Sequence, residues 1–225
     1  MKKRAVCIIS GGMDSALGAT LSRNEGYEII ALHFNYGQRT EQKERQAFES
    51  IADFLEAKER YSIDVDFFKT IGASALTDPS LVVPTGGIEA GVPITYVPFR
   101  NGIFLSIATA IAEKHEAEAI VIGVVEEDSS GYPDCREGYI QAMERAINLG
   151  TKAETNIEIK MPLVHLKKEQ IVQKALELGV PLEKTWSCYQ NETKACGVCD
   201  SCRLRLKGFA LAGVEDPITY RLASE

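Results

Sequence analysis

RAVCIISGGMDS, residues 4–15, is the stretch that decides the fold of this chain. Its apolar half predicts a short buried strand from Arg4 to Ile9, and the glycines that follow predict a tight turn into a helix over residues 14–24. Two glycines can take positive φ angles and turn successive backbone amides inward, toward the positive end of the helix dipole. Strand, turn and helix together predict a phosphate-binding loop.

A plainer interpretation of the same residues is a tight turn with a helix cap. The loop is neither the GxGxxG dinucleotide fingerprint nor a Walker A loop, since no lysine follows Gly12, and this disfavours transfer of a γ-phosphate. Asp14 would repel phosphate unless a cation intervened, which indicates a bridging Mg²⁺ or a capping role. The hydroxyls of Ser10 and Ser15 can donate to phosphate oxygens. The strand-turn-helix context favours phosphate binding.

The rest of the chain alternates predicted strands with predicted helices. We expect strands at 28–35, 61–68 and 119–125, and helices at 40–55, 101–114, 135–149 and 167–178. This alternation predicts an α/β fold with a doubly wound parallel sheet, whose ligands lie at the carboxyl ends of the strands. The proline- and glycine-rich residues 77–98 predict a long loop that could serve as a lid. We expect one α/β domain over 1–182 and a small zinc-binding segment over 183–225.

Composition narrows the function further. The 225 residues are 45% hydrophobic and carry a formal charge of −7. An acidic chain argues against a broad nucleic-acid surface, which needs an excess of Lys and Arg. The first apolar run breaks at Ser10, too soon for a secretory signal, and no segment reaches the roughly 18 apolar residues of a membrane span. We therefore expect a cytoplasmic protein with no membrane partner and no direct nucleic-acid partner.

Four of the six cysteines gather in CYQNETKACGVCDSC, residues 188–202. In a reducing compartment, clustered thiols bind metal more often than they form disulfides. The C-x2-C-x2-C spacing predicts a closed tetrahedral site for structural Zn²⁺, with no open position for a catalytic water. An iron-sulfur cluster is the alternative, although the bacterial ferredoxin run continues differently after its third cysteine. The predicted metal ligands are Cys188, Cys196, Cys199 and Cys202.

Several motifs together resemble the PP-loop ATP pyrophosphatases and, among them, the 7-cyano-7-deazaguanine synthase family. They begin with SGGMDS at residues 10–15 and include MPL at 161–163, which is followed by Lys168. The resemblance covers nearly the whole chain, and its further motifs are FNYGQRTEQ at 34–42, VPFRN at 97–101, SGYPDCR at 130–136 and the cysteine pattern.

The resemblance implies an ATP-dependent C–N ligase in queuosine or archaeosine biosynthesis. A carboxylate oxygen of 7-carboxy-7-deazaguanine would attack the α-phosphorus of ATP, and ammonia would displace AMP to give an amide. Because one adenylation installs nitrogen without removing the remaining oxygen, a second adenylation would convert the amide to the nitrile. The expected cofactors are ATP, Mg²⁺ and structural Zn²⁺. A homodimer is one assembly that the sequence leaves open.

Candidate site residues follow from the motifs and from this chemistry. A planar deazaguanine needs aromatic stacking and hydrogen bonds, and an arginine can orient its carboxylate. Each arginine could instead form a surface salt bridge, and Lys168 could simply be solvated. The candidates are Ser10, Asp14, Ser15 and Lys168 for catalysis; Ile9, Ser10, Gly11, Gly12, Met13, Asp14, Ser15 and Arg39 for ATP; and Arg100, Asn101, Tyr132, Asp134 and Arg136 for the substrate.

Other interpretations stay open at the level of sequence. One is a PP-loop enzyme that modifies tRNA directly, and another transfers the activated deazaguanine carboxylate to a protein amine. A third is a non-enzymatic zinc module whose contact face is the basic stretch 203–207, although these residues could equally coat a helix or meet ATP. Cys135 could be a nucleophile, but no histidine has an obvious pairing with it, so a packing role is favoured.

Overall fold

Five parallel strands form a single sheet in the computed structural model, which describes residues 3–87, 91–126 and 131–221. The strand order is β3-β2-β1-β4-β5, so the chain winds outward from β1 in both directions. This confirms the predicted doubly wound sheet and places the switch point between β1 and β4. The strands are β1 (Arg4–Ile8), β2 (Glu28–Asn35), β3 (Glu59–Asp64), β4 (Ala119–Val121) and β5 (Glu158–Lys160).

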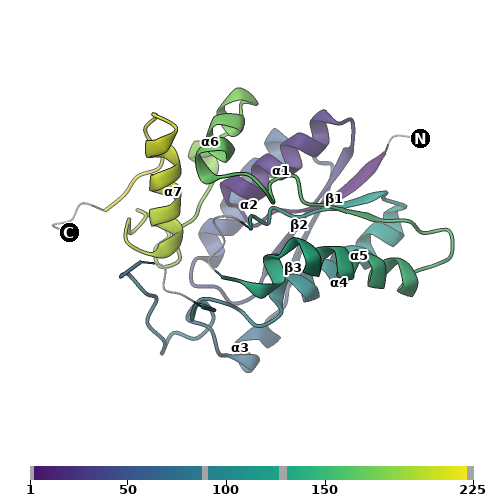
Figure 1. The fold of residues 1–225 in the computed structure, drawn as a ribbon, viewed down its shortest axis with the longest axis horizontal. Helices are drawn as coiled ribbons and strands as arrows, with labels where there is room; N and C mark the ends of the chain where they lie inside the picture. The colour runs from purple at the N-terminus through teal and green to yellow at the C-terminus, as the bar shows by residue number, and fades with distance from the viewer. Residues whose placement is uncertain (1–2, 88–90, 127–130, 222–225) are drawn as a thin grey trace.

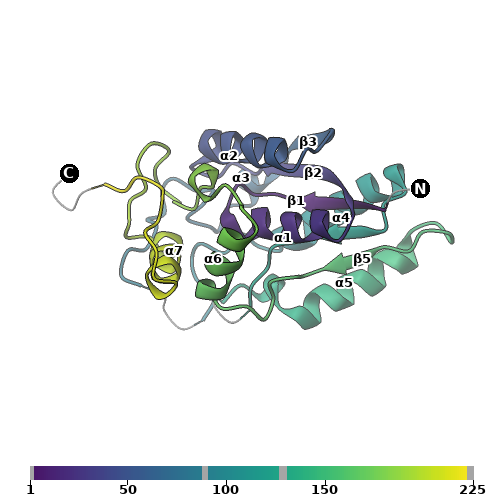
Figure 2. The same cartoon turned by 90° about the horizontal axis from the view of Figure 1, so that it is seen from above.

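Helices cover both faces of the sheet, as Figures 1 and 2 show. Alternate residues of β1 feed two separate cores, because successive side chains of a strand point to opposite faces. Ala5 and Cys7 belong to the core shared with α1 (Met13–Asn24), α2 (Glu41–Phe54) and α6 (Lys168–Glu177). Val6 and Ile8 belong to the core shared with α4 (Arg100–His115) and α5 (Glu137–Gly150). Within the described ranges, no helix is long and apolar enough to cross a membrane.

Two predicted strands end earlier than expected. The strand predicted at 61–68 begins at Glu59 and ends at Asp64, because the chain turns there into the short helix α3 (Phe67–Ile71). The strand predicted at 119–125 ends at Val121, and its continuation bends beneath the loop that follows β1. The three-residue strand β5 was not predicted, since so short an edge strand carries too little periodicity to be recognised.

The C-terminal residues pack against α2, α6 and the long loop rather than standing apart from the rest of the chain. A third cluster joins Trp186 and the cysteines to Ala47 of α2 and to Val83 of the long loop. The last helix, α7 (Asp200–Leu211), lies beside α6 at the end of the molecule away from the N-terminus (Figures 1 and 2). A short 3-10 turn, η2 (Leu182–Lys184), leads into this region, and another, η1 (Pro133–Cys135), precedes α5.

The basic stretch 203–207 is not a uniform contact face. Arg205 is 1% exposed, and its guanidinium donates to both carboxylate oxygens of Asp216 at 2.7 and 3.0 Å. It also donates to Thr185 Oγ1 at 2.7 Å and to the carbonyl of Leu182 at 3.1 Å. A buried arginine with these bonds fixes α7 to the preceding chain and is not part of an exposed contact face.

Candidate active site

The loop after β1 is held in shape by its own two serine side chains. Ser15 Oγ accepts the N–H of Ser10 at 3.2 Å and donates to the carbonyl of Gly12 at 3.0 Å. Ser10 Oγ accepts the N–H of Gly12 at 3.3 Å and lies 3.2 Å from Ser15 Oγ. The two hydroxyls therefore hold the turn that leads into α1. The N-terminus of a helix favours anions.

Gly11 is required in this turn by both its conformation and its surroundings. Its φ angle is +93°, and a Cβ atom there would lie 2.7 Å from the carbonyl oxygen of Glu44. The expectation of two positive-φ glycines was wrong for Gly12, which has a φ of −82° and forms the N-cap of α1. Within this loop, Gly11 is therefore the one residue with a left-handed backbone. Its lack of a side chain allows α2 to pack directly against the loop.

Asp14 and Lys168 form an ion pair beside the loop. Lys168 Nζ lies 2.9 Å from Oδ2 and 3.1 Å from Oδ1 of Asp14, so it bridges both carboxylate oxygens. Lys168 is 8% exposed at the start of α6, and it is held there by α7. A Cβ atom added to Gly208 would lie 2.5 Å from Lys168 Cγ, so the absence of a side chain at Gly208 makes room for the lysine.

A cavity of about 280 Å³ opens in front of this loop. Its walls come from the carboxyl ends of the strands, the start of α4 and the chain around the cysteines, as the rule for doubly wound sheets predicts. Most of the residues predicted from the sequence contribute to it. They are Ile9, Ser10, Gly12, Met13, Asp14, Ser15, Arg100, Asn101, Tyr132 and Lys168.

Four predicted residues lie outside the cavity walls in the described structure: Gly11, Arg39, Asp134 and Arg136. Arg39 holds the long loop, donating to the carbonyls of Ala75 at 2.8 Å, Asp78 at 3.0 Å and Leu81 at 2.5 Å. Arg136 is exposed at the N-cap of α5. Their predicted roles with ATP and substrate stay predictions. The first residue of the motif SGYPDCR, at position 130, lies outside the described residues together with 127–129.

Asp134 does not line the cavity but holds Asn101, which does. Its Oδ2 accepts the backbone N–H of Asn101 at 2.9 Å, and its backbone carbonyl accepts the Asn101 amide at 3.3 Å. Burial raises the pKa of Asp134, although the hydrogen bond from Asn101 opposes this change. The Asn101 amide also donates to Cys135 Sγ at 3.3 Å, and burial raises the pKa of that thiol to about 11. A protonated, hydrogen-bonded thiol is a poor nucleophile, which agrees with the packing role expected for Cys135.

Arg100 lines the cavity from the start of α4. Its Nη1 donates to Tyr36 Oη at 3.1 Å, and its guanidinium lies 5.1 Å from the Tyr36 ring centroid and 5.9 Å from that of Phe104. Tyr132 is buried nearby, and its hydroxyl donates to Thr95 Oγ1 at 2.9 Å. An arginine held by aromatic rings keeps donors free for a carboxylate, while the ring of Tyr132 offers a flat surface.

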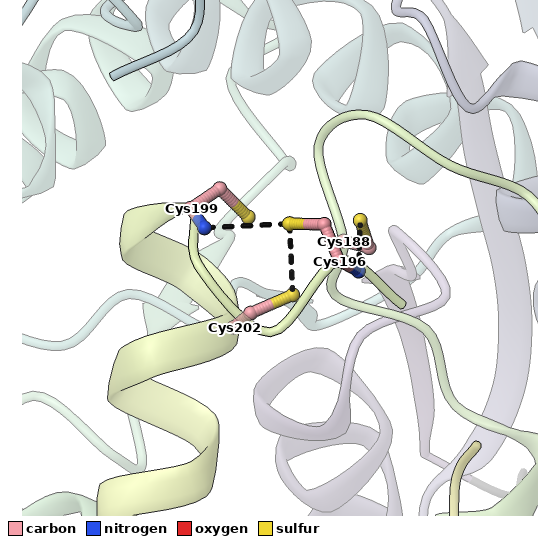
Figure 3. A group of neighbouring side chains, drawn as sticks. All are labelled: Cys188, Cys196, Cys199 and Cys202. Atoms are coloured by element: carbon pink, nitrogen blue, oxygen red, sulfur yellow. Dashed lines mark hydrogen bonds between the residues drawn. The ribbon is translucent and has the colours of Figure 1, made fainter. Parts of the chain in front are cut away.

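The four cysteines predicted to bind metal converge on one point (Figure 3). Their sulfur atoms all lie within 4.8 Å of one another, and those of Cys196 and Cys202 are 3.9 Å apart. Backbone N–H groups donate to two of the sulfurs, as from Cys196 to Cys188 at 3.3 Å and from Cys199 to Cys196 at 3.3 Å. Hydrogen bonds from the Cys199 and Cys202 thiols, together with these N–H groups, hold the pKa of Cys188 far below its usual value. Such a donor set suits a thiophilic metal ion.

The cysteine region is tied directly to the phosphate loop. The backbone N–H of Trp186 donates to the carbonyl of Gly11 at 2.8 Å, two residues before the first cysteine. Thr40 Oγ1 lies 3.2 Å from the carbonyl of Cys188. Trp186, Ser187 and Tyr189 also line the cavity. The chain around the four cysteines therefore forms one wall of the cavity, although none of the four cysteines lines it.

Comparison with known proteins fits this geometry. The family model described as "Queuosine biosynthesis protein QueC" matches residues 4–213. The chain belongs to the QueC family. The 7-cyano-7-deazaguanine synthase of Sulfurovum sp. (strain NBC37-1) is 75% identical over 221 residues, which cover 98% of this chain and 100% of that protein. The protein of the same name from Nautilia profundicola is 66% identical over 219 residues, covering 97% and 99%.

The fold of this QueC family member is shared more widely. A 4-thiouridine synthetase, solved as an RNA complex with bound ATP, aligns with a TM-score of 0.54 over 94% of this chain and 50% of that one. The two sequences are 19% identical, so this likeness concerns the fold alone.

Two functional candidates of this QueC chain were missed in the sequence. Glu44 of α2 lines the cavity and accepts hydrogen bonds from Thr40 Oγ1 at 2.7 Å and Gln38 Nε2 at 3.1 Å. Helix α2 carries many charged residues, and no sequence pattern distinguishes Glu44 from the exposed ones. The motif at 34–42 ends two residues before it and was the nearest available signal.

His33 is the second missed residue. It is 1% exposed at the end of β2, its Nδ1 lies 2.9 Å from the carbonyl of Ile9, and its ring stacks on Phe48. Burial lowers the pKa of His33, and the hydrogen bond to Ile9 only partly offsets this. A neutral ring that donates from Nδ1 therefore supports the first residue of the phosphate loop.

Proposed function

We propose that this chain is a 7-cyano-7-deazaguanine synthase. It converts 7-carboxy-7-deazaguanine and ammonia to the nitrile, consuming two ATP and releasing two AMP and two pyrophosphates. The observation that carries the proposal is the 75% identity, over 98% of the chain, to a protein of that name. The cavity supports it, because a phosphate-type loop, the Asp14–Lys168 pair and Arg100 all line it.

On the ATP side, the loop amides and Lys168 bind the phosphates, and their positive charge stabilises the departing pyrophosphate. The residues present fit Mg²⁺, because Asp14 offers carboxylate oxygens at the cavity and its side chain is 30% exposed. When bound, Mg²⁺ would supply Lewis-acid stabilisation of the phosphate charge. Ser10 and Ser15 keep the loop open toward these phosphates through their mutual hydrogen bonds.

On the substrate side, Arg100 orients the carboxylate, and later the amide oxygen, toward the α-phosphorus. Tyr132 stacks on the planar base, and Asn101 reads one polar edge of it. Asp134 acts through Asn101, whose backbone and side chain it fixes. Holding both reactants in one geometry supplies much of the rate enhancement in such a transfer.

For the metal at the four cysteines, we propose structural Zn²⁺. A tetrahedron with zinc-sulfur bonds of about 2.3 Å needs sulfur-sulfur edges of about 3.8 Å, and the 3.9 Å between Cys196 and Cys202 agrees with it. Four thiolates this close suit a single ion better than a four-iron cluster, in which each thiolate binds a separate iron. All four positions are taken by sulfur, so the ion organises the chain and leaves the chemistry to the cavity.

Several finer features belong to the same proposal. The α/β domain spans 1–182, and 183–225 form a zinc-binding segment packed on it. A cytoplasmic location fits reduced cysteines that bind metal. The formal charge of −7 favours a free base over tRNA as the substrate. A homodimer stays one open assembly state, and the long loop 77–98 stays a predicted lid.

Mass spectrometry of a complete reaction tests the function. Purified protein with ATP, Mg²⁺, ammonia and 7-carboxy-7-deazaguanine should yield the nitrile. Supplied with the synthetic amide instead, it should yield nitrile without ammonia, with one ATP consumed and one AMP released per product. Absence of nitrile from the amide, or nitrile without AMP, would exclude the two-adenylation mechanism. Incorporation into tRNA or into a protein amine would favour the alternatives.

A further inference from the structure

The cavity contains a second carboxylic acid whose environment differs from that of Asp14. Among the described residues, the acids that line the cavity are Asp14 and Glu44. Asp14 is paired with Lys168 at 2.9 Å, whereas the two oxygens of Glu44 accept hydrogen bonds from the neutral side chains of Thr40 and Gln38. These two bonds fix the Glu44 carboxylate without neutralising its charge.

Glu44 lies between the two halves of the site. Its backbone carbonyl abuts Gly11, so its helix packs directly on the phosphate loop. Its charge also acts on Tyr36 and Arg100, which line the cavity as well. Glu44 therefore lines the same cavity as the phosphate loop and Arg100, in which the α-phosphate and the substrate carboxylate of the proposed reaction would meet.

We propose that Glu44 is the general base that takes the proton from ammonia as it attacks the adenylated carboxylate. This inference rests on the proposed function, since it assigns one proton transfer within that reaction. The nitrogen lone pair forms the new C–N bond while the C=O π pair moves onto the carbonyl oxygen, which gives a tetrahedral intermediate with a positive nitrogen and a negative oxygen. Glu44 removes one N–H proton, the oxygen pair re-forms C=O, and the C–O bond to AMP breaks so that AMP leaves with the bonding electrons.

The products are the amide, AMP and protonated Glu44, which returns its proton to solvent. Loss of that proton prevents the nitrogen from leaving again as ammonia. A base working near neutral pH must accept a proton readily and release it again. Burial raises the pKa of Glu44 to about 7, although the hydrogen bonds from Thr40 and Gln38 and the charge of Arg100 oppose this change.

Neighbouring charges affect the pH range over which Glu44 gains and loses its proton. Arg100 on α4 favours the carboxylate form, and Glu192 from the cysteine region disfavours it. Tyr36 stays neutral, because burial raises its pKa well above the usual value. We expect the rate of amide formation, expressed against free ammonia, to rise with pH through about 7 and then level off.

The variant Glu44→Gln tests the inference, because it keeps the shape of the side chain and removes its basicity. Two reactions are measured on the full chain. Pyrophosphate exchange into ATP, with 7-carboxy-7-deazaguanine and no ammonia, reports adenylation. Formation of amide and nitrile with added ammonium chloride reports the attack by nitrogen. Glu49→Gln, an exposed acid on the same helix, is the matched control.

We expect Glu44→Gln to keep exchange within about 3-fold and to lose at least about 100-fold in the ammonia step, the usual worth of a positioned base. Its remaining rate should show no break near pH 7, while Glu49→Gln should follow the wild-type profile. A Glu44→Gln protein that retains both the ammonia step and the break overturns the inference, and so does one that loses exchange as well. If the wild type itself forms no amide or nitrile, the proposed function fails instead.

Discussion

Lys168 Nζ bridges both carboxylate oxygens of Asp14, at 2.9 and 3.1 Å, and so joins the start of α6 to the start of α1 beside the phosphate loop. The two residues are far apart in the sequence but share one edge of the cavity. Under the proposed function, ATP with Mg²⁺ would offer each of them a stronger partner, a phosphate for the lysine and a cation for the aspartate. We infer that the ion pair holds both groups in place until nucleotide binds.

Replacing either member of this pair should remove adenylation while leaving the fold intact. Asp14→Ala and Lys168→Met are each expected to lower pyrophosphate exchange at least about 100-fold, because each loses charge stabilisation of the phosphates. Both variants should stay folded, because the Asp14 side chain is 30% exposed and neither change empties the hydrophobic core. Lys160→Met, which breaks the ion pair with Glu25 away from the cavity, should leave exchange unchanged. Near-normal turnover and ATP affinity in Asp14→Ala would contradict the assignment.

Loss of one cysteine should affect both metal content and nucleotide binding. Cys199→Ser is expected to bind less zinc and to lower the melting temperature, because a missing thiolate weakens a site that organises the chain. ATP affinity should fall as well, since Trp186 and Tyr189 reach the cavity from this region. Cys135→Ser lies outside the cluster and should retain full metal content. Metal analysis, thermal denaturation and ATP titration check the prediction, and unchanged values in Cys199→Ser would refute it.

The contact between α7 and Lys168 gives a third prediction. In Gly208→Ala the new methyl group would meet Lys168 Cγ at 2.5 Å and its carbonyl oxygen at 3.2 Å, so the lysine or the helix must move. We expect a loss of about 1–3 kcal/mol in unfolding free energy from overpacking. Nitrile formation should fall by about 10-fold or more, since the lysine is displaced from Asp14.

Gly138→Ala provides the matched control for this change, because nothing lies within 4 Å of the added Cβ. Alanine is favoured over glycine inside a helix by up to about 1 kcal/mol, so this variant should be as stable as the wild type or more so. Equal activity of the two variants would show that the packing of α7 on Lys168 does not matter.

His33 should contribute a loss of stability in mild acid. Its pKa in the folded protein is lowered by burial, whereas an unfolded chain has the ordinary value of about 6.5. The unfolded state therefore binds the proton first, and this contribution is lost as pH falls from about 6.5 through the folded pKa. Glu44 acts with the opposite sign over the same range, because its folded pKa is raised to about 7. Denaturant titrations of the wild type and of His33→Gln between about pH 7.5 and 5 separate the two effects, since the wild type should lose unfolding free energy relative to the variant as pH falls. The same pH dependence in both proteins would assign the effect to other groups.

The sequence predicted those parts of the site that are contiguous in it. The phosphate loop, β2 and the cysteine cluster each occupy one short stretch with a definite chemical pattern. Glu44 and His33 could not be recognised in this way, because their roles depend on burial and on neighbours brought by other elements. Arg205 looked like a surface charge for the same reason, since its partner Asp216 lies in a loop with no pattern of its own.

The hydrogen bond from Trp186 to Gly11 also has a consequence for biosynthesis of the protein. Gly11 leaves the ribosome long before Trp186 and the four cysteines do. The nascent chain can assemble most of its sheet early, but the wall that closes the phosphate loop has to wait until Trp186 and the cysteines have emerged. We expect ATP-consuming activity to appear only after these residues have emerged and the cysteines have bound the proposed metal ion.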